Sequence, residues 1–152
     1  MITALLKFSL FSHIILGVAA VAAAYAVLMS LLKRESNIRF LETVSLGGLV
    51  VLLLSWITGA YYYVIYYGPA VRDVIKKGPY PWAHSIVMEA KEHVFLFLPF
   101  LFVALFLSII AGRTFLNQNL MFKRSLIAVA AILTIISVSI ALAGMGISGA
   151  AR

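Results

Sequence analysis

The sequence predicts an all-α integral membrane protein, an up-down-up-down four-helix bundle that forms one transmembrane domain over residues 1–152. Hydrophobic residues make up 64% of the chain and charged residues 11%, far from the composition of soluble globular proteins. Four segments lack Lys, Arg, Asp and Glu, and each approaches or exceeds the ~20 residues that a helix needs to cross ~30 Å of hydrocarbon. These segments are 8–32, 43–71, 94–112 and 125–151.

The first two helices have clear stop signals. The first is expected over residues 5–32, where the charged turn after Leu32 ends it. Its apolar run is longer than the core of a signal peptide, so we expect a retained helix. The second is expected over 41–67, where Gly68-Pro69 should break it. An aromatic belt at its end predicts the water interface: Trp56, Tyr61, Tyr62, Tyr63, Tyr66 and Tyr67.

The longest connection precedes the third helix. Apolar residues at helical spacing opposite basic ones predict a short interfacial helix over 69–77. The third helix is expected over 82–112, with a kink at Pro99, which removes one backbone hydrogen bond. The fourth is expected over 122–147.

The short connections predict antiparallel neighbours, with both termini on one side of the membrane. The net charge of +7 is assigned to lipid headgroups rather than to nucleic acid, because the basic residues flank the apolar runs. These residues divide evenly between the two faces, but one basic residue precedes the first helix and three follow it, which favours termini outside. We expect an integral protein of a prokaryotic-type inner or plasma membrane.

The chain contains no cysteine, which excludes disulfides, iron–sulfur clusters and covalently attached c-type haem. Two histidines are predicted at one depth. Lys33 follows His13 by twenty residues, and Arg113 follows His93 by twenty. At ~1.5 Å per residue both imidazoles lie ~30 Å from the far charged face.

Glycines are predicted at the same level on the other two helices. Gly59 follows Arg39 by twenty residues, and Gly144 follows Arg124 by twenty. Gly17 belongs to a small-residue stripe that shares the helix face of His13. Glycine at these places would leave room for a flat ligand.

The first and third helices of such a bundle face each other across its core. We therefore predict that His13 and His93 are the axial ligands of one haem b. Glu89 lies one turn before His93, where its carboxylate would orient the ring through the second nitrogen. His84 points half a turn away from His93 and is not expected to bind the same metal. Four basic residues are candidates to meet the propionates: Arg72, Lys76, Lys77 and Lys91.

A different metal is the main alternative for this site. His13, His93 and Glu89, with Glu92, would offer ligands to zinc, iron or copper. Two methionines extend this alternative to a soft copper site: Met88 and Met145. Interfacial histidines are also common as structural residues, which is the reading favoured for His84.

The arrangement resembles small membrane b-type cytochromes, in particular cytochrome b561-like and CopD-like helical domains. The matching stretches are Ser12-His13, Trp56-Ile-Thr-Gly-Ala60 and Lys91-Glu-His93. The chain departs from those families by offering one matched histidine pair instead of two. The resemblance therefore implies one haem on one side of the bilayer.

These observations predict a non-catalytic electron-transfer subunit of a respiratory oxidoreductase complex, exchanging electrons on the terminal side with quinol or a partner. A quinone site would use His84 or Glu89 to accept a proton. The expected partners are lipid together with other membrane subunits or further copies of the chain, and no nucleic acid. Two alternatives remain open: a cofactor-free anchoring or assembly subunit, and a copper-handling membrane protein.

Overall fold

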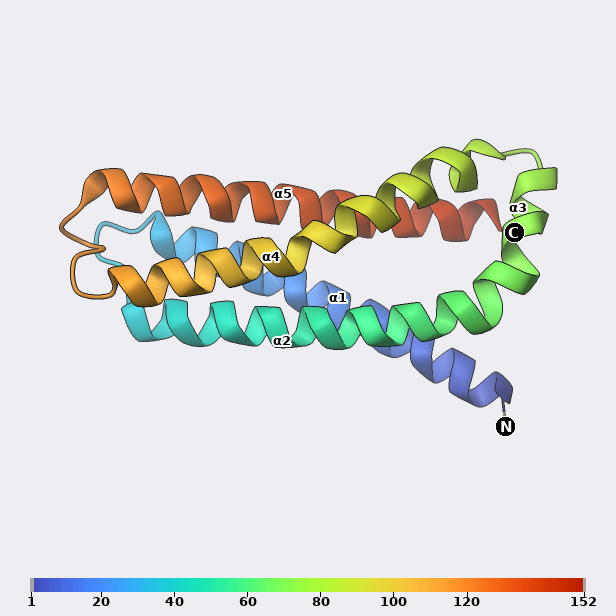
Figure 1. The fold of residues 1–152 in the computed structure, drawn as a ribbon, viewed down its shortest axis with the longest axis horizontal. Helices are drawn as coiled ribbons and strands as arrows, with labels where there is room; N and C mark the ends of the chain where they lie inside the picture. Colours follow the sequence, from blue (N-terminus) through green and yellow to red (C-terminus); the bar gives the residue numbers. More distant parts are fainter. Residues whose placement is uncertain (1, 152) are drawn as a thin grey trace.

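The computed structural model describes residues 2–151, with side chains from residue 3 onward. All of its regular elements are helical, and four helices are long and apolar enough to cross a membrane (Figure 1). These spans are Thr3–Leu31, Ile38–Lys77, Ala83–Gly112 and Leu120–Ala150. The all-α prediction is therefore confirmed, as is the prediction of four helices long and apolar enough to span a membrane.

Asparagine caps set the start of two helices. Helix α1 covers Ile2–Leu31 and α2 covers Ile38–Tyr62. Asn37 precedes α2 and accepts a hydrogen bond from the backbone N–H of Phe40 at 3.1 Å. Helix α5, Leu120–Ala150, begins in the same way, because Asn119 accepts from Phe122 N–H at 3.0 Å. These caps satisfy otherwise free N–H groups, so both helices begin before the residues predicted from apolar pattern alone.

The predicted break at Gly68-Pro69 is wrong. The chain continues from α2 into a π-helical segment, η1 (Tyr63–Val71), which contains both residues, and then into α3 (Arg72–Lys77). A proline ring clashes with the carbonyl four residues earlier in an α-helix, and the chain around Pro69 has π-helical rather than α-helical hydrogen bonding. The ribbon bends here without ending, so that α3 lies across the end of the bundle (Figure 1).

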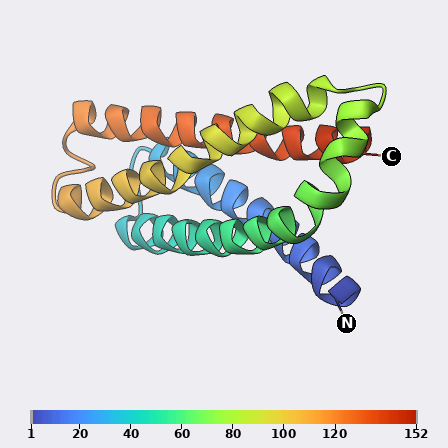
Figure 2. The same cartoon turned by 45° about the vertical axis from the view of Figure 1, so that its right-hand side comes forward.

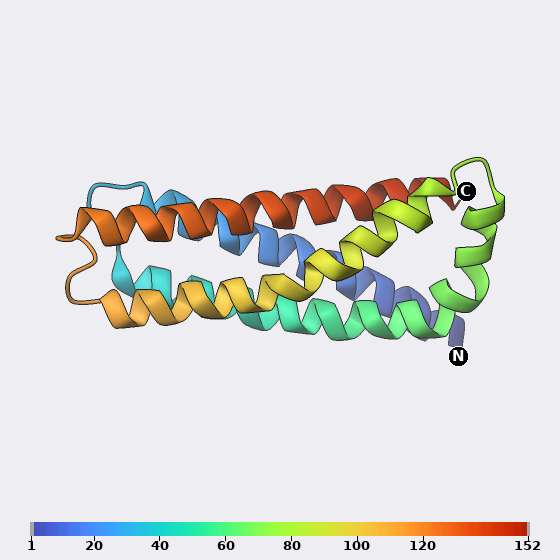
Figure 3. The same ribbon diagram turned by 45° about the horizontal axis from the view of Figure 1, so that its top comes forward.

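The third span also begins with π turns. Segment η2 covers Ala83–Met88 and leads into α4, Glu89–Gly112, with Pro99 inside it. Figure 3 shows that α4 runs beside α2 over its second half and diverges toward α5 over its first half. The divergence separates α2 from α4 near the end of the molecule where both labelled termini lie (Figures 1 and 2).

Helices α1 and α4 occupy diagonal positions. Each packs against both α2 and α5, and these are the main helix–helix contacts among the described residues. Fully buried side chains from α1 and α4 fill the shared core, including Val27, Leu31, Phe102, Leu105 and Ile109. Large apolar side chains cover the outer surface, and Phe100 is 72% exposed, which suits a lipid surround.

Polar contacts join the two connections at the opposite end of the molecule. The buried ammonium of Lys123 donates to the carbonyl oxygens of Lys33 at 2.7 Å and Arg34 at 3.0 Å. Asn117 and Ser36 exchange a reciprocal pair of hydrogen bonds at 3.0 and 3.1 Å. The turn after α1 is therefore fixed to the start of α5.

Candidate cofactor site

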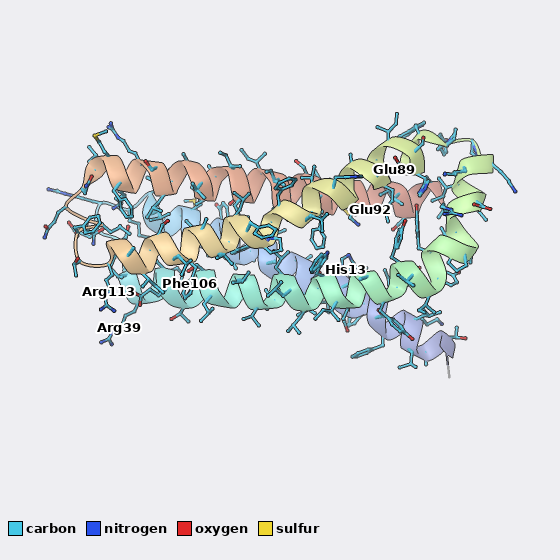
Figure 4. The ribbon with its side chains drawn as sticks, in the orientation of Figure 1. His13, Arg39, Glu89, Glu92, Phe106 and Arg113 are labelled. Atoms are coloured by element: carbon cyan, nitrogen blue, oxygen red, sulfur yellow. The ribbon has the colours of Figure 1, made fainter. Side chains whose placement is uncertain are left out.

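A cavity of about 360 Å³ is lined by both of the histidines that were predicted to lie at one depth, His13 and His93. It lies between α1, the α2–η1 helix and the η2–α4 helix, on the side of the diverging first half of α4. His13 reaches it from α1 and His93 from α4, and Figure 4 shows His13 in the interior, between the ribbons. The remaining lining residues are mostly apolar or aromatic: Trp56, Gly59, Ala60, Tyr63, Val64, Met88, Lys91, Glu92, Phe95 and Leu96.

The backbone of α2 holds the His13 ring. Its Nδ1 atom lies 2.8 Å from the carbonyl oxygen of Ser55 and 3.0 Å from the Ser55 hydroxyl. That hydroxyl in turn donates to the carbonyl of His13 at 3.0 Å. Because a carbonyl oxygen only accepts, Nδ1 carries the proton and Nε2 keeps its lone pair. His13 thus presents a fixed ring with one nitrogen free to bind a metal.

His93 is held by the same chemistry on a different helix. Its Nδ1 atom lies 2.6 Å from the carbonyl oxygen of Glu89. The prediction that the Glu89 carboxylate orients this ring is wrong, because the backbone oxygen of Glu89 takes that position. Glu89 is one helical turn away in either case, so its sequence spacing does not distinguish the side chain from the carbonyl. His93 is also left with Nε2 as its free nitrogen.

Gly59 makes room for the His13 imidazole. A Cβ atom on Gly59 would lie 2.6 Å from Nδ1 and 2.8 Å from Cε1 of His13, closer than real atoms pack. The absent side chain thus makes room for the His13 ring, whereas the predicted role of Gly59 was to leave room for a flat cofactor. This close approach also sets the distance between α1 and α2 at the cavity.

The other two glycines that were predicted to border the cofactor are Gly17 and Gly144. A Cβ on Gly17 would meet the Ser55 hydroxyl at 3.5 Å, and one on Gly144 would meet the Lys91 ammonium at 3.5 Å. Within the part of the chain that the structure describes, the cavity lining includes neither of them, nor Glu89. Both distances are ordinary van der Waals contacts, so neither position requires glycine for space, and the Lys91 side chain lies near Gly144 of α5.

Two charged residues of the cavity had a subsidiary place in the predictions, Lys91 as one candidate partner for the propionates and Glu92 as a further metal ligand. Lys91 and Glu92 both line it, directly before His93 in the sequence. Glu92 Oε1 is buried and has no hydrogen-bond partner among residues 3–151. Around the helix Glu92 lies ~100° from His93 and Lys91 ~200°, so a shared helix face does not account for both.

His84 belongs to a separate cluster near α3. Its Nδ1 atom lies 3.0 Å from the hydroxyl of Tyr67, and its side chain is 4% exposed. Tyr67 stacks on Tyr63 with ring centroids 5.3 Å apart. The lining of the cavity, as far as the chain is described, does not include His84, in accord with the structural reading.

The ligand set of the cavity limits which metals it suits. Among residues 3–151 there is no group of three or more His, Asp or Glu side chains placed to hold a metal ion. Structural zinc sites use four protein ligands and catalytic ones three. Two imidazoles suffice for an iron that brings four equatorial nitrogens of its own.

Comparisons of the chain with protein-family models, curated proteins and solved structures gave no match. The resemblance to small b-type cytochromes therefore stays a prediction.

Proposed function

We propose that this protein is a membrane haem b electron-transfer subunit with His13 and His93 as the axial ligands. One observation carries the proposal: two histidines from diagonal helices line one cavity, and each has its Nδ1 fixed by a backbone carbonyl. Metal-binding histidines typically donate their second ring N–H in this way, which fixes the tautomer and the ring orientation. The Ser55 contact crosses from α2 to α1 and the Glu89 contact lies within one turn of α4, so main-chain oxygens orient both rings.

The cavity lining suits a flat apolar group with acidic substituents. Trp56, Phe95 and Leu96 supply apolar walls, and Lys91 supplies a cation for a propionate. Bound haem would contribute a one-electron iron couple, whose potential depends on axial ligands, burial and nearby charge. The residues of the chain would orient the ring, exclude water and balance the charge.

We place the termini, the cavity and α3 on one side of the membrane, with the helices crossing alternately as an up-down-up-down bundle. The support is that α3 and both labelled termini lie at one end of the molecule (Figure 1), and that the cavity is lined in part by η1 and η2, the segments on either side of α3. On this assignment one haem near one surface exchanges electrons with quinol or with a respiratory partner on that side. The basic residue counts around α1 favour an outside location for this surface.

A copper site is the second candidate, favoured by Met88. This thioether lines the same cavity as His13 and His93, whereas Met145 is 64% exposed. Two imidazoles and a thioether are a ligand set suited to Cu(I). A cofactor-free anchoring subunit is the third candidate, supported by the broad apolar surface.

Metal and haem analysis of the purified protein separates the three candidates. The protein would be produced with added haem precursor, extracted in mild detergent and assayed for iron, copper and non-covalent haem. The proposal predicts about one haem iron per chain and a b-type α band in the reduced-minus-oxidised spectrum. Copper without haem would support the second candidate, and the absence of both metals the third.

A further inference from the structure

A second cavity, of about 660 Å³, lies at the other end of the molecule from the histidines. It is a groove between the first half of α2 and the second half of α4. Its inner part is lined by apolar side chains, among them Leu46, Val50, Phe106 and Ile110. Its volume falls within the ~300–1,000 Å³ typical of sites for small ligands.

The outer part of the groove is charged. Glu42 and Arg113 lie there, and Arg39 is one helical turn before Glu42 and Thr43 on α2. Figure 4 shows Arg39 and Arg113 extending from the same end of the bundle. Both are exposed, and the one ion pair within residues 3–151 joins Arg72 to Asp73, at the opposite end. Within residues 3–151 neither guanidinium is in an ion pair, and Glu42 is the one acidic residue that lines the groove.

Gly47 keeps the groove open. It lines the groove, and a Cβ atom built on it would meet no atom within 4 Å. Its neighbour Gly48 differs, because a Cβ there would lie 2.5 Å from the Phe102 ring. Close packing of α2 against α4 thus explains Gly48, whereas no atom of the described residues occupies the space beside Gly47.

We propose that this groove binds one anionic phospholipid, with an acyl chain between α2 and α4 and the phosphate at Arg39 and Arg113. The planar guanidinium fork matches phosphate oxygens, and basic sites between membrane helices favour anionic headgroups. The long apolar part selects a lipid over a soluble phosphate. The site is independent of the cofactor cavity and goes beyond the proposed function.

Lipid titration monitored by native mass spectrometry tests the headgroup contact. Dioleoylphosphatidylglycerol, with dioleoylphosphatidylcholine in parallel, is added to delipidated protein in detergent. The double variant Arg39→Gln/Arg113→Gln is expected to bind the anionic lipid about tenfold more weakly than wild type. The matched control, Arg34→Gln/Arg124→Gln, removes the same charge from the same end and is expected to bind within about twofold of wild type.

Gly47→Leu tests the acyl-chain contact. Leucine would fill the open space, and we expect lower affinity for the anionic lipid with unchanged helix content by circular dichroism. Gly146→Leu is the control, because a Cβ at Gly146 also meets no atom within 4 Å and Gly146 lies on α5, away from the groove. Equal affinity for the two lipids, equal loss in both arginine pairs, or equal binding by both leucine variants would overturn the proposal.

Discussion

The Nδ1 atom of His13, on α1, lies 2.8 Å from the carbonyl oxygen of Ser55, on α2. This contact sets the ring orientation and assigns the proton to Nδ1, because a carbonyl oxygen only accepts. It depends on close approach of the two helices, which Gly59 permits. The position of the proposed haem ligand is therefore determined by the α1–α2 packing.

Gly59→Ala should displace His13. The added methyl group would lie 2.6 Å from Nδ1, so the ring must move or the helices separate, at a cost of about 1–3 kcal/mol. We expect lower haem content and a lower unfolding midpoint in detergent denaturation. Gly47→Ala is the control, because a Cβ there meets no atom within 4 Å. Full haem content in Gly59→Ala would show that the position of the His13 ring does not limit haem binding.

Gly48→Ala should destabilise the core without affecting the histidines directly. Its Cβ would lie 2.5 Å from the Phe102 ring and 2.9 Å from Ala23, both of which belong to neighbouring helices. Overpacking predicts a loss of about 1–3 kcal/mol in the free energy of unfolding. Gly47→Ala, one residue away, should leave stability equal or raise it, because alanine is the better helix former. Equal stability of both variants would contradict the packing seen here.

Lys123→Met should loosen the connection between α1 and α2. The Lys123 side chain is 6% exposed, and its ammonium donates to the carbonyls of Lys33 and Arg34. Losing these charge-assisted bonds should cost about 2–4 kcal/mol. Hydrogen exchange should become faster over residues 32–37. Arg124→Met is the control, because Arg124 is the exposed neighbour of Lys123. Comparable exchange rates over residues 32–37 in the two variants would refute the role of Lys123 in fixing this connection.

Tyr67→Phe should destabilise the segment around η2. It removes the hydroxyl that lies 3.0 Å from the buried Nδ1 of His84, which leaves that nitrogen without its partner. The expected cost is about 1–3 kcal/mol, read as faster hydrogen exchange over residues 78–88. Tyr66→Phe is the control, since its hydroxyl makes no hydrogen bond within residues 3–151 and the residue is 40% exposed. A larger effect from Tyr66→Phe would contradict the assignment.

The four helices and the shared depth of His13 and His93 could be predicted from the sequence for different reasons. Long uncharged runs predict the spans because lipid excludes charge. Counting from Lys33 and Arg113 placed His13 and His93 at one depth, and the structure brings both to one cavity.

The contacts that orient the His13 and His93 imidazoles could not be predicted from the sequence. Carbonyl oxygens of Ser55 and Glu89 orient the two imidazoles, and every residue has a carbonyl, so no residue type marks them. Likewise π turns carry the chain through Pro69, whereas proline by itself predicts a break.

The central claim is that His13 and His93 together hold one haem. The most direct measurement is the haem content and reduced-minus-oxidised spectrum of His13→Ala, His93→Ala and His84→Gln beside wild type. We predict loss or a marked change of the b-type bands in each of the first two and wild-type bands in His84→Gln, whose histidine lies outside the cavity. Bands unchanged in both His13→Ala and His93→Ala, or absent from wild type, would contradict the account.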